Sequence, residues 1–156
     1  MKFIHLQLSF ALLLFIQFNT SAQEFDIEIS KPTVINADNY LGDAARIPGD
    51  MIVKKETPLS FEGEDQDKYT VVEKDLILEE GSILVLNENT NLIIEGELII
   101  QGENVILDIA PGAHFSIQGD ISGNGKAYTV ESPVIYTNGN TSNNIHNAEY
   151  IVSYSR

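Results

Sequence analysis

The chain has 156 residues, with 9 basic against 23 acidic side chains, a formal net charge of −14 and no cysteine. Such an acidic surface disfavours nucleic acid and anionic membranes as direct partners, and a chain without cysteine has no disulfide framework, no thiolate metal site and no cysteine nucleophile. Packing alone must therefore hold the fold together, in a chain long enough for one domain with a real core.

Residues 1–22 have the layout of a secretory signal peptide. Lys2 is followed by the apolar stretch 10–18 and by small residues ending at Ala22. This apolar run is shorter than the roughly 20 residues of a membrane-spanning helix. We expect cleavage after Ala22 and export to the periplasm or the cell exterior. The mature chain 23–156 then has no membrane span, and loss of Lys2 makes its formal charge −15. A retained membrane anchor is the alternative.

Residues 23–68 are predicted to form an irregular N-terminal capping segment. Three prolines interrupt it, and its hydrophobic pattern indicates only a short strand at 24–30 and one helical turn around 37–46. The segment ends in the acidic turn "EGEDQDK" at 62–68. Oxygen ligands at alternating positions suit calcium, but the turn departs from the EF-hand pattern and is typical of a solvated loop. If calcium binds there, Asp65 and Asp67 are the candidate ligands; no other cofactor is indicated.

From Tyr69 onward, brief apolar runs are separated by Gly, Asn, Asp and Glu. No interval is long enough for a helix, so the pattern predicts strands of three to five residues and an all-β fold. Three sets of apolar positions recur at 22 or 23 residues: Leu76, Leu98 and Ile121; Ile83 and Val105; Leu92 and Phe115. One shared period is typical of a short right-handed parallel β-helix with three strands per coil, here about three to four coils and a C-terminal cap over 69–156. A sandwich or meander is the alternative.

The side-chain alternation predicts which residues face outward. In "HFSI", Phe115 and Ile117 flank Ser116, so the apolar residues point inward and the serine outward. Carried back along the coils, this phase places four apolar residues on outer faces as ladders: Ile77 above Ile99, and Leu84 above Ile106. Such ladders need a cover. Residues 23–68 are the first candidate, followed by a second copy or an envelope partner, and then by an apolar ligand.

The glycine-rich stretch "GDISGNGK" at 119–126 is interpreted as a structural corner. Gly96 lies one period before Gly119, and Gly102 one period before Gly125. Glycines that recur with the coil indicate corners where the backbone turns sharply or coils approach closely. A phosphate loop is disfavoured because no helix follows.

The runs "LILEEGSILVLNENTNLIIEGELIIQG" and "GDISGNGK" resemble coils of right-handed parallel β-helix proteins, particularly the pectin-lyase-like superfamily of exported polysaccharide lyases and glycoside hydrolases. The resemblance covers about residues 70–130 and lies at the level of the fold. It implies a carbohydrate context. None of the catalytic motifs of those enzymes can be matched onto this chain, so no activity is implied.

Catalysis has one weak candidate pair. Glu97 and Asp120 occupy equivalent corners one coil apart, roughly 5 Å by the interstrand spacing, which overlaps the separation in retaining glycosidases. Solvated corner carboxylates are the simpler interpretation, and we lean towards a non-catalytic protein. His114 precedes an inward residue and is expected to point outward or to lie at a corner.

Tyrosines and asparagines towards the C-terminus indicate a carbohydrate-facing surface. The candidate binding residues are Tyr128, Tyr136, Asn138 and Asn140, because phenol rings and amides match sugar ring faces and hydroxyls. The leading hypothesis is an exported non-catalytic β-helix protein that binds polysaccharide or assists its degradation. The alternative is a structural protein that assembles with itself or with an envelope component through its apolar ladders. A small lyase or hydrolase is the third.

Overall fold

The computed structural model describes residues 26–131, 133–142, 144–146 and 150–153, the last of these by backbone alone. The expected signal peptide lies outside these residues. Among the described residues the fold is all-β, with one 3-10 turn, η1 (Ala37–Asn39), as its only helical element. No helix in this part of the chain has the length and hydrophobicity to span a membrane.

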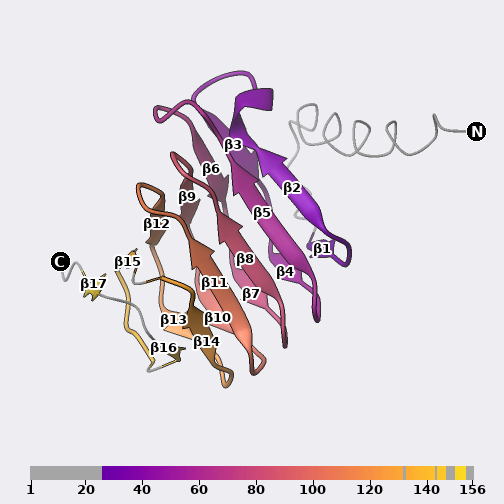
Figure 1. Ribbon diagram of the computed structural model, residues 1–156, viewed down its shortest axis with the longest axis vertical. Coiled ribbons are helices and arrows are strands. Elements are labelled where there is room, and N and C mark those ends of the chain that lie inside the picture. The colour runs from indigo at the N-terminus through magenta and orange to yellow at the C-terminus, as the bar shows by residue number, and fades with distance from the viewer. Residues whose placement is uncertain (1–25, 132, 143, 147–149, 154–156) are drawn as a thin grey trace, which may run out of the picture.

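The strands form three parallel sheets that wind into a solenoid (Figure 1). Sheet A contains β1 (Ile27–Ile29), β4 (Met51–Val53), β7 (Leu76–Leu78), β10 (Leu98–Ile100) and β13 (Ile121–Ser122). Sheet B contains β2 (Thr33–Asn36), β5 (Pro58–Glu62), β8 (Ile83–Leu86), β11 (Val105–Ile109), β14 (Ala127–Thr129) and β16 (Ile145–His146). Sheet C contains β3 (Ala44–Ile47), β6 (Tyr69–Val72), β9 (Asn91–Ile94), β12 (His114–Ile117), β15 (Val134–Thr137) and β17 (Tyr150–Ser153).

Each of the first five coils contributes one strand to each sheet, the last coil contributes β16 and β17 to sheets B and C, and the coils stack in chain order. Figure 1 shows this stack running from the indigo N-terminal end to the yellow C-terminal end. The predicted all-β parallel β-helix with three strands per coil is confirmed. Leu76, Leu98 and Ile121 are in register in sheet A, as their spacing predicts. All three are buried in the core between the three sheets, where inward rows of aliphatic side chains stack along the solenoid.

The structure extends the solenoid to the N-terminal side of residue 69. Ile27 pairs with Met51, and Thr33 pairs with Leu59, so the segment expected to be irregular contributes complete coils. These pairs are 24 and 26 residues apart, whereas the pairs of β7 with β10 and of β10 with β13 are 22 and 23 residues apart. The longer loops 37–43 and 63–68 between sheets B and C absorb the difference. Because the loops vary in length, these coils show no constant period in the sequence.

The side chains of strand β8 alternate in the opposite phase to the predicted one, so Leu84 points inward and not outward. The register pairs Leu84 with Leu107, and Leu84 is 0% exposed, so its placement on an outer ladder is wrong. Ile83 is the residue that pairs with Ile106 on the outer face. The reason is that the corner before β11 is one residue longer than the corner before β8. Residues paired in sheet A, before this corner, are 22 apart, and Ile83 and Ile106, after it, are 23 apart. A shift of one residue turns every side chain of a strand to the other face.

The glycine corners bring successive coils into backbone contact, as the sequence analysis predicts. A Cβ atom at Gly119 would lie 2.6 Å from the carbonyl oxygen of Gly96. Acidic residues complete the same corner: Asp75 Oδ1 accepts a hydrogen bond of 2.7 Å from the backbone N–H of Glu97, and Asp120 Oδ1 accepts one of 2.6 Å from that of Asn140. Glycine provides the close approach, and the carboxylate satisfies a backbone donor of the next coil.

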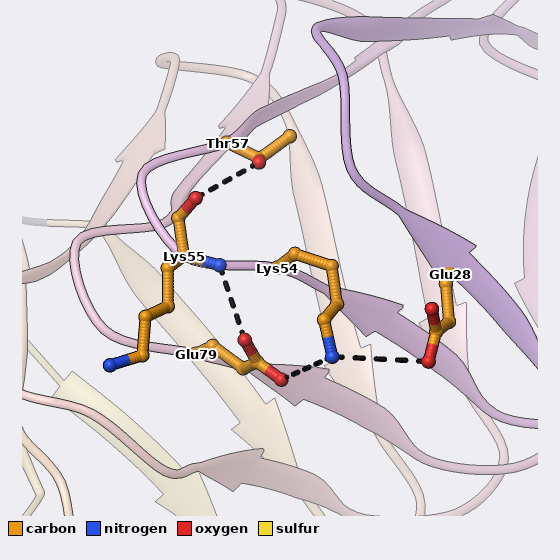
Figure 2. A network of polar contacts seen from close by, with 5 residues as sticks. All are labelled: Glu28, Lys54, Lys55, Thr57 and Glu79. Atoms are coloured by element: carbon orange, nitrogen blue, oxygen red, sulfur yellow. Dashed lines mark hydrogen bonds and ion pairs between the residues drawn. The ribbon is translucent and has the colours of Figure 1, made fainter.

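The corner between sheets A and B carries ion pairs that also link coils (Figure 2). Lys54 Nζ lies 2.7 Å from Glu79 Oε1 and 3.8 Å from Glu28 Oε1, so it joins three successive coils. The hydrogen bond with Glu79 is the main cause that raises the pKa of Lys54, and the charge of Glu28 adds to it. Glu79 also accepts a hydrogen bond of 3.2 Å from the backbone N–H of Lys55. This corner is therefore strongly charged.

Candidate functional site

The outer face of sheet C differs from the charged corner because nearly all its side chains are uncharged. Strand alternation and register place two outward rows there. We define the sheet C face by these rows: Ala44, Tyr69, Asn91, His114 and Val134 in the first, and Arg46, Val71, Ile93, Ser116 and Tyr136 in the second. Arg46 is the only Asp, Glu, Lys or Arg residue among these ten.

The charge of Arg46 is compensated within the protein. Its Nη1 atom lies 3.2 Å from Glu73 Oε1 and 3.1 Å from Glu95 Oε1. The hydrogen bond with Glu73, followed by the one with Glu95, raises the pKa of Arg46. Val71, the residue paired with Arg46 in the sheet, is only 4% exposed although it points outward. The Arg46 side chain thus reaches across two coils, and the face presents no uncompensated cation from these ten residues.

Two aromatic rings from neighbouring coils stack on this face. His114 of β12 and Tyr136 of β15 have ring centroids 4.9 Å apart and ring planes inclined by 28°. Tyr136 is in register with Ser116, so its ring reaches diagonally towards His114. Both side chains are partly exposed. They form a polarisable surface at the edge of sheet C that borders sheet B.

A pocket of about 370 Å³ opens beside this pair. One wall is the four-residue turn 110–113 between β11 and β12, and the other includes Pro133 and Val134. Among the described residues that line it, His114, Tyr136 and Glu131 have polar side chains, and Glu131 is the only Asp, Glu, Lys or Arg. The volume lies at the lower end of the range for small-molecule sites. Its composition suits a ligand with an apolar ring face and hydroxyl groups at the periphery.

The predicted binding residues are divided between faces. Tyr136 lines the pocket, and Asn138 lies directly after the end of the same strand, where its amide donates a hydrogen bond to the side chain of Gln118. Asn140 lies at the corner between sheets C and A, held to Asp120. Tyr128 lies on sheet B, paired with Ile106, and stacks on His146 with centroids 5.4 Å apart. The structure therefore brings Tyr136 and Asn138 together and separates them from Tyr128.

The candidate catalytic carboxylates occupy consecutive coils, since Leu98 pairs with Ile121. Glu97 Oε2 accepts a hydrogen bond of 2.8 Å from Ser122 Oγ, and Asp120 Oδ1 accepts the backbone bond from Asn140. Each carboxylate is thus bound to the following coil. Neither residue lines the pocket beside His114.

The candidate calcium ligands lie in an exposed turn. Asp65 Oδ1 accepts a hydrogen bond of 3.0 Å from the backbone N–H of Asp67, which closes the turn locally. Within the part of the chain that the structure describes, no three His, Asp or Glu side chains are grouped so that they could hold a metal ion.

The apolar ladders are partly exposed and are not covered by the N-terminal segment. Ile77 and Ile99 form one outward row with Ile52 in sheet A, and Ile106 follows Ile83 in sheet B. Residues 27–62 contribute strands β1–β5 to the three sheets, so they extend these faces rather than lie over them. The expectation that residues 23–68 fold back over the ladders fails for this reason.

Two residues of the sheet C face, Tyr69 and Asn91, are not among the four binding residues predicted from the sequence. The signal was available, because Tyr69, Asn91 and His114 are 22 and 23 residues apart, the same spacing as the core positions. Only the register shows that this spacing places all three in one outward row.

Comparison of the chain with protein-family models, with curated proteins and with solved structures gives no match.

Proposed function

We propose that this protein is an exported, non-catalytic β-helix protein that binds polysaccharide through the sheet C face. The observation that carries the proposal is the stacked pair of His114 and Tyr136, which both line the pocket. Glu131 is the only Asp, Glu, Lys or Arg among the described residues of this lining. The charge pattern of residues 1–22 supports export, and the β-helix coils support a role beside polysaccharide-degrading enzymes.

The chemistry of the pair matches a sugar. An aromatic ring presents a negative face to the weakly positive C–H groups on one side of a pyranose, while hydroxyl and amide groups bind the sugar hydroxyls. Tyr136, His114 and Glu131 contribute polar side-chain groups to the described lining of the pocket. This arrangement binds a ring from one side and leaves both neighbours in a polymer free to continue.

Native affinity electrophoresis of the mature chain tests the proposal. The gels contain neutral or acidic polysaccharides, each with calcium or with a chelator. We expect a neutral polymer to retard the protein, and Tyr136→Ala to weaken binding roughly twofold to tenfold, which corresponds to about 0.5–1.5 kcal/mol for one aromatic contact. Loss of retardation with the chelator would instead assign the binding to calcium and the turn with Asp65 and Asp67.

Tyr128→Ala is the matched control. Tyr128 is also a tyrosine stacked on a histidine in the C-terminal coils, but it lies on sheet B. We expect its removal to leave retardation unchanged. If no polymer retards the wild-type protein, the proposal is wrong. If Tyr128→Ala weakens binding more than Tyr136→Ala does, the sheet C site is wrong.

Assembly through the apolar ladders is the second candidate function, and the exposure on sheet B favours it. Val34 is 59% and Tyr128 40% exposed on this face, and Val130, just after β14, is 63% exposed. Six strands about 4.8 Å apart and about four residues long give a face of roughly 300 Å². A standard interface buries about 800 Å² per partner, so sheet B alone is too small for a stable dimer. Concentration-dependent assembly without glycan retention would favour this function.

An enzyme of the lyase or hydrolase type is the third candidate. Its test is bond cleavage by the wild-type protein that Glu97→Gln or Asp120→Asn abolishes. We expect no such cleavage, because hydrogen bonds to the next coil occupy both carboxylates.

A further inference from the structure

A row of three polar or aromatic side chains runs along the solenoid on the sheet C face. Tyr69, Asn91 and His114 occupy equivalent positions in three successive coils, each in register with the next. Tyr69 is 38% exposed at the far end of this row from the pocket. The row therefore carries aromatic rings at both ends, on Tyr69 and on the stacked pair of His114 with Tyr136.

The separation of these two aromatic positions has a defined length. Neighbouring strands of a sheet lie about 4.8 Å apart, so two coils separate the Tyr69 and His114 positions by about 10 Å. That length is comparable to two linked pyranose rings in an extended β-1,4-linked chain. Sugar rings two residues apart can therefore contact both aromatic positions at once.

Asn91 lies between the Tyr69 and His114 positions and leaves room for a ligand that extends from one to the other. Asn91 Nδ2 donates hydrogen bonds of 2.7 Å to the carbonyl oxygen of Gln66 and 3.0 Å to that of Lys68. The amide is thus held against the neighbouring loop. In the second row, Ile93 and Ser116 are small or partly buried side chains beside this path.

The charges around the face select against an anionic ligand. Arg46 is paired with Glu73 and Glu95, and Lys68 Nζ lies 3.3 and 3.4 Å from two backbone carbonyl oxygens of the loop 37–43. Glu131 lies at the pocket, and the whole chain has a net charge of −14. A polymer of uronic acids would meet repulsion here without a compensating cation.

From these observations we infer that the sheet C face holds an uncharged, extended β-linked glycan lying along the solenoid axis. One sugar ring contacts His114 and Tyr136 at the pocket, and a second ring, two residues along the chain, contacts Tyr69. This inference rests on the proposed function and adds to it the ligand class, the direction of the bound chain and the binding role of Tyr69.

The test compares ligand lengths by isothermal titration calorimetry on the mature chain. The probes are β-1,4-linked glucose, xylose and mannose oligosaccharides, each as disaccharide and hexasaccharide. We expect a hexasaccharide to bind more tightly than its disaccharide because only the longer ligand reaches Tyr69. Tyr69→Ala should weaken hexasaccharide binding roughly twofold to tenfold and leave the disaccharide unchanged, whereas Tyr136→Ala should weaken both.

Three controls separate binding from folding. Tyr69→Phe keeps the ring and should keep most of the hexasaccharide affinity, and thermal unfolding of each variant reports its stability. Tyr128→Ala should change neither ligand. A uronic acid hexasaccharide in the presence of a chelator should bind at least tenfold more weakly than the neutral one, which is a difference in binding free energy of about 1.4 kcal/mol.

The outcomes distinguish the inference from the proposed function. If Tyr136→Ala weakens binding but Tyr69→Ala leaves hexasaccharide affinity unchanged, the axial path is wrong and the pocket site stands. Equal binding of the uronic acid probe would overturn the selection for neutral chains. If none of the neutral hexasaccharides binds while a polysaccharide still retards the protein in gels, the inferred ligand class is wrong and polysaccharide binding remains.

Discussion

Single glycines set the distance between coils at the corner between sheets C and A. Gly119 lies over the backbone of Gly96, and the neighbouring Asp120 accepts a hydrogen bond from the next coil. The two residues have separate tasks, since glycine permits close approach and the carboxylate satisfies a donor. The same pairing of glycine with an acidic residue recurs at this corner in Gly49-Asp50 and Gly96-Glu97.

Gly119→Ala tests this arrangement at the scale of one residue. The added methyl group would lie 2.6 Å from Gly96 O and 2.8 Å from Gly96 C, which are backbone atoms that cannot move aside cheaply. We expect the free energy of unfolding to fall by about 1–3 kcal/mol, as for overpacked cores. Urea denaturation followed by circular dichroism measures it.

Gly63→Ala is the control for the glycine test. A Cβ atom at Gly63 would have Ala37 Cβ as its nearest neighbour at 3.8 Å, an ordinary contact. We expect a change of less than about 0.5 kcal/mol, as for surface substitutions. Equal destabilisation by both variants would show that close backbone contact between coils is not the reason why residue 119 is a glycine.

At the scale of the element, the phase of a strand decides which of its residues build the core. In β8, Leu84 pairs with Leu107 inside and Ile83 with Ile106 outside. These neighbours have similar hydrophobicity, so composition does not distinguish them. The corner that precedes β11 is one residue longer than the corner that precedes β8, and this difference sets the relative phase of the two strands.

Leu84→Ala and Ile83→Ala form a matched pair that tests this phase. Leu84 is fully buried, so its truncation should lower the free energy of unfolding by about 2–5 kcal/mol. Ile83 is partly exposed on the outer face of sheet B, and its truncation should cost about 1 kcal/mol or less. Thermal and urea unfolding give both values. The reverse order would mean that the strand has the opposite phase.

At the scale of the whole molecule, excess negative charge opposes compaction. The acidic residues exceed the basic ones by 14, and stacking places like charges in adjacent coils, as with Glu73 and Glu95. Ion pairs such as that of Lys54 with Glu79 offset this repulsion only locally. Salt should therefore stabilise the protein, because screening weakens the repulsion more than it weakens close pairs.

A thermal unfolding series in NaCl measures this effect. Raising the salt from about 0.01 M to about 0.1 M shortens the Debye length from about 30 Å to about 10 Å. If screening recovers roughly 1 kcal/mol, the Tm of a chain of this size should rise by about 2–4 °C. A Tm that falls with NaCl would show that ion pairs dominate instead.

Calcium chloride at matched ionic strength completes the series. We expect the same shift as with NaCl when screening is the only effect. A larger shift that saturates at low calcium, and that Asp65→Asn and Asp67→Asn both remove, would identify the acidic turn as a calcium site.

The sequence predicts the sheet C site only in part. Tyr136 and Asn138 are predicted from their residue types, and the structure places Tyr136 on this face and Asn138 directly after the same strand. Tyr128 and Asn140 were selected by the same argument and lie on a neighbouring sheet and corner. Residue type indicates the chemistry, but the face depends on the phase of each strand.

By itself, the sequence determined the all-β class, the three strands per coil and the acidic surface. This is possible because inward apolar residues recur every 22 or 23 residues wherever the corners keep a nearly constant length, and this period is visible in the sequence. Only the tertiary structure decided the N-terminal coils, the side of Leu84 and the meeting of Tyr69 with His114 and Tyr136 on one face. The physical reason is that loops of variable length shift the register without changing the strands, and lateral neighbours are set by register.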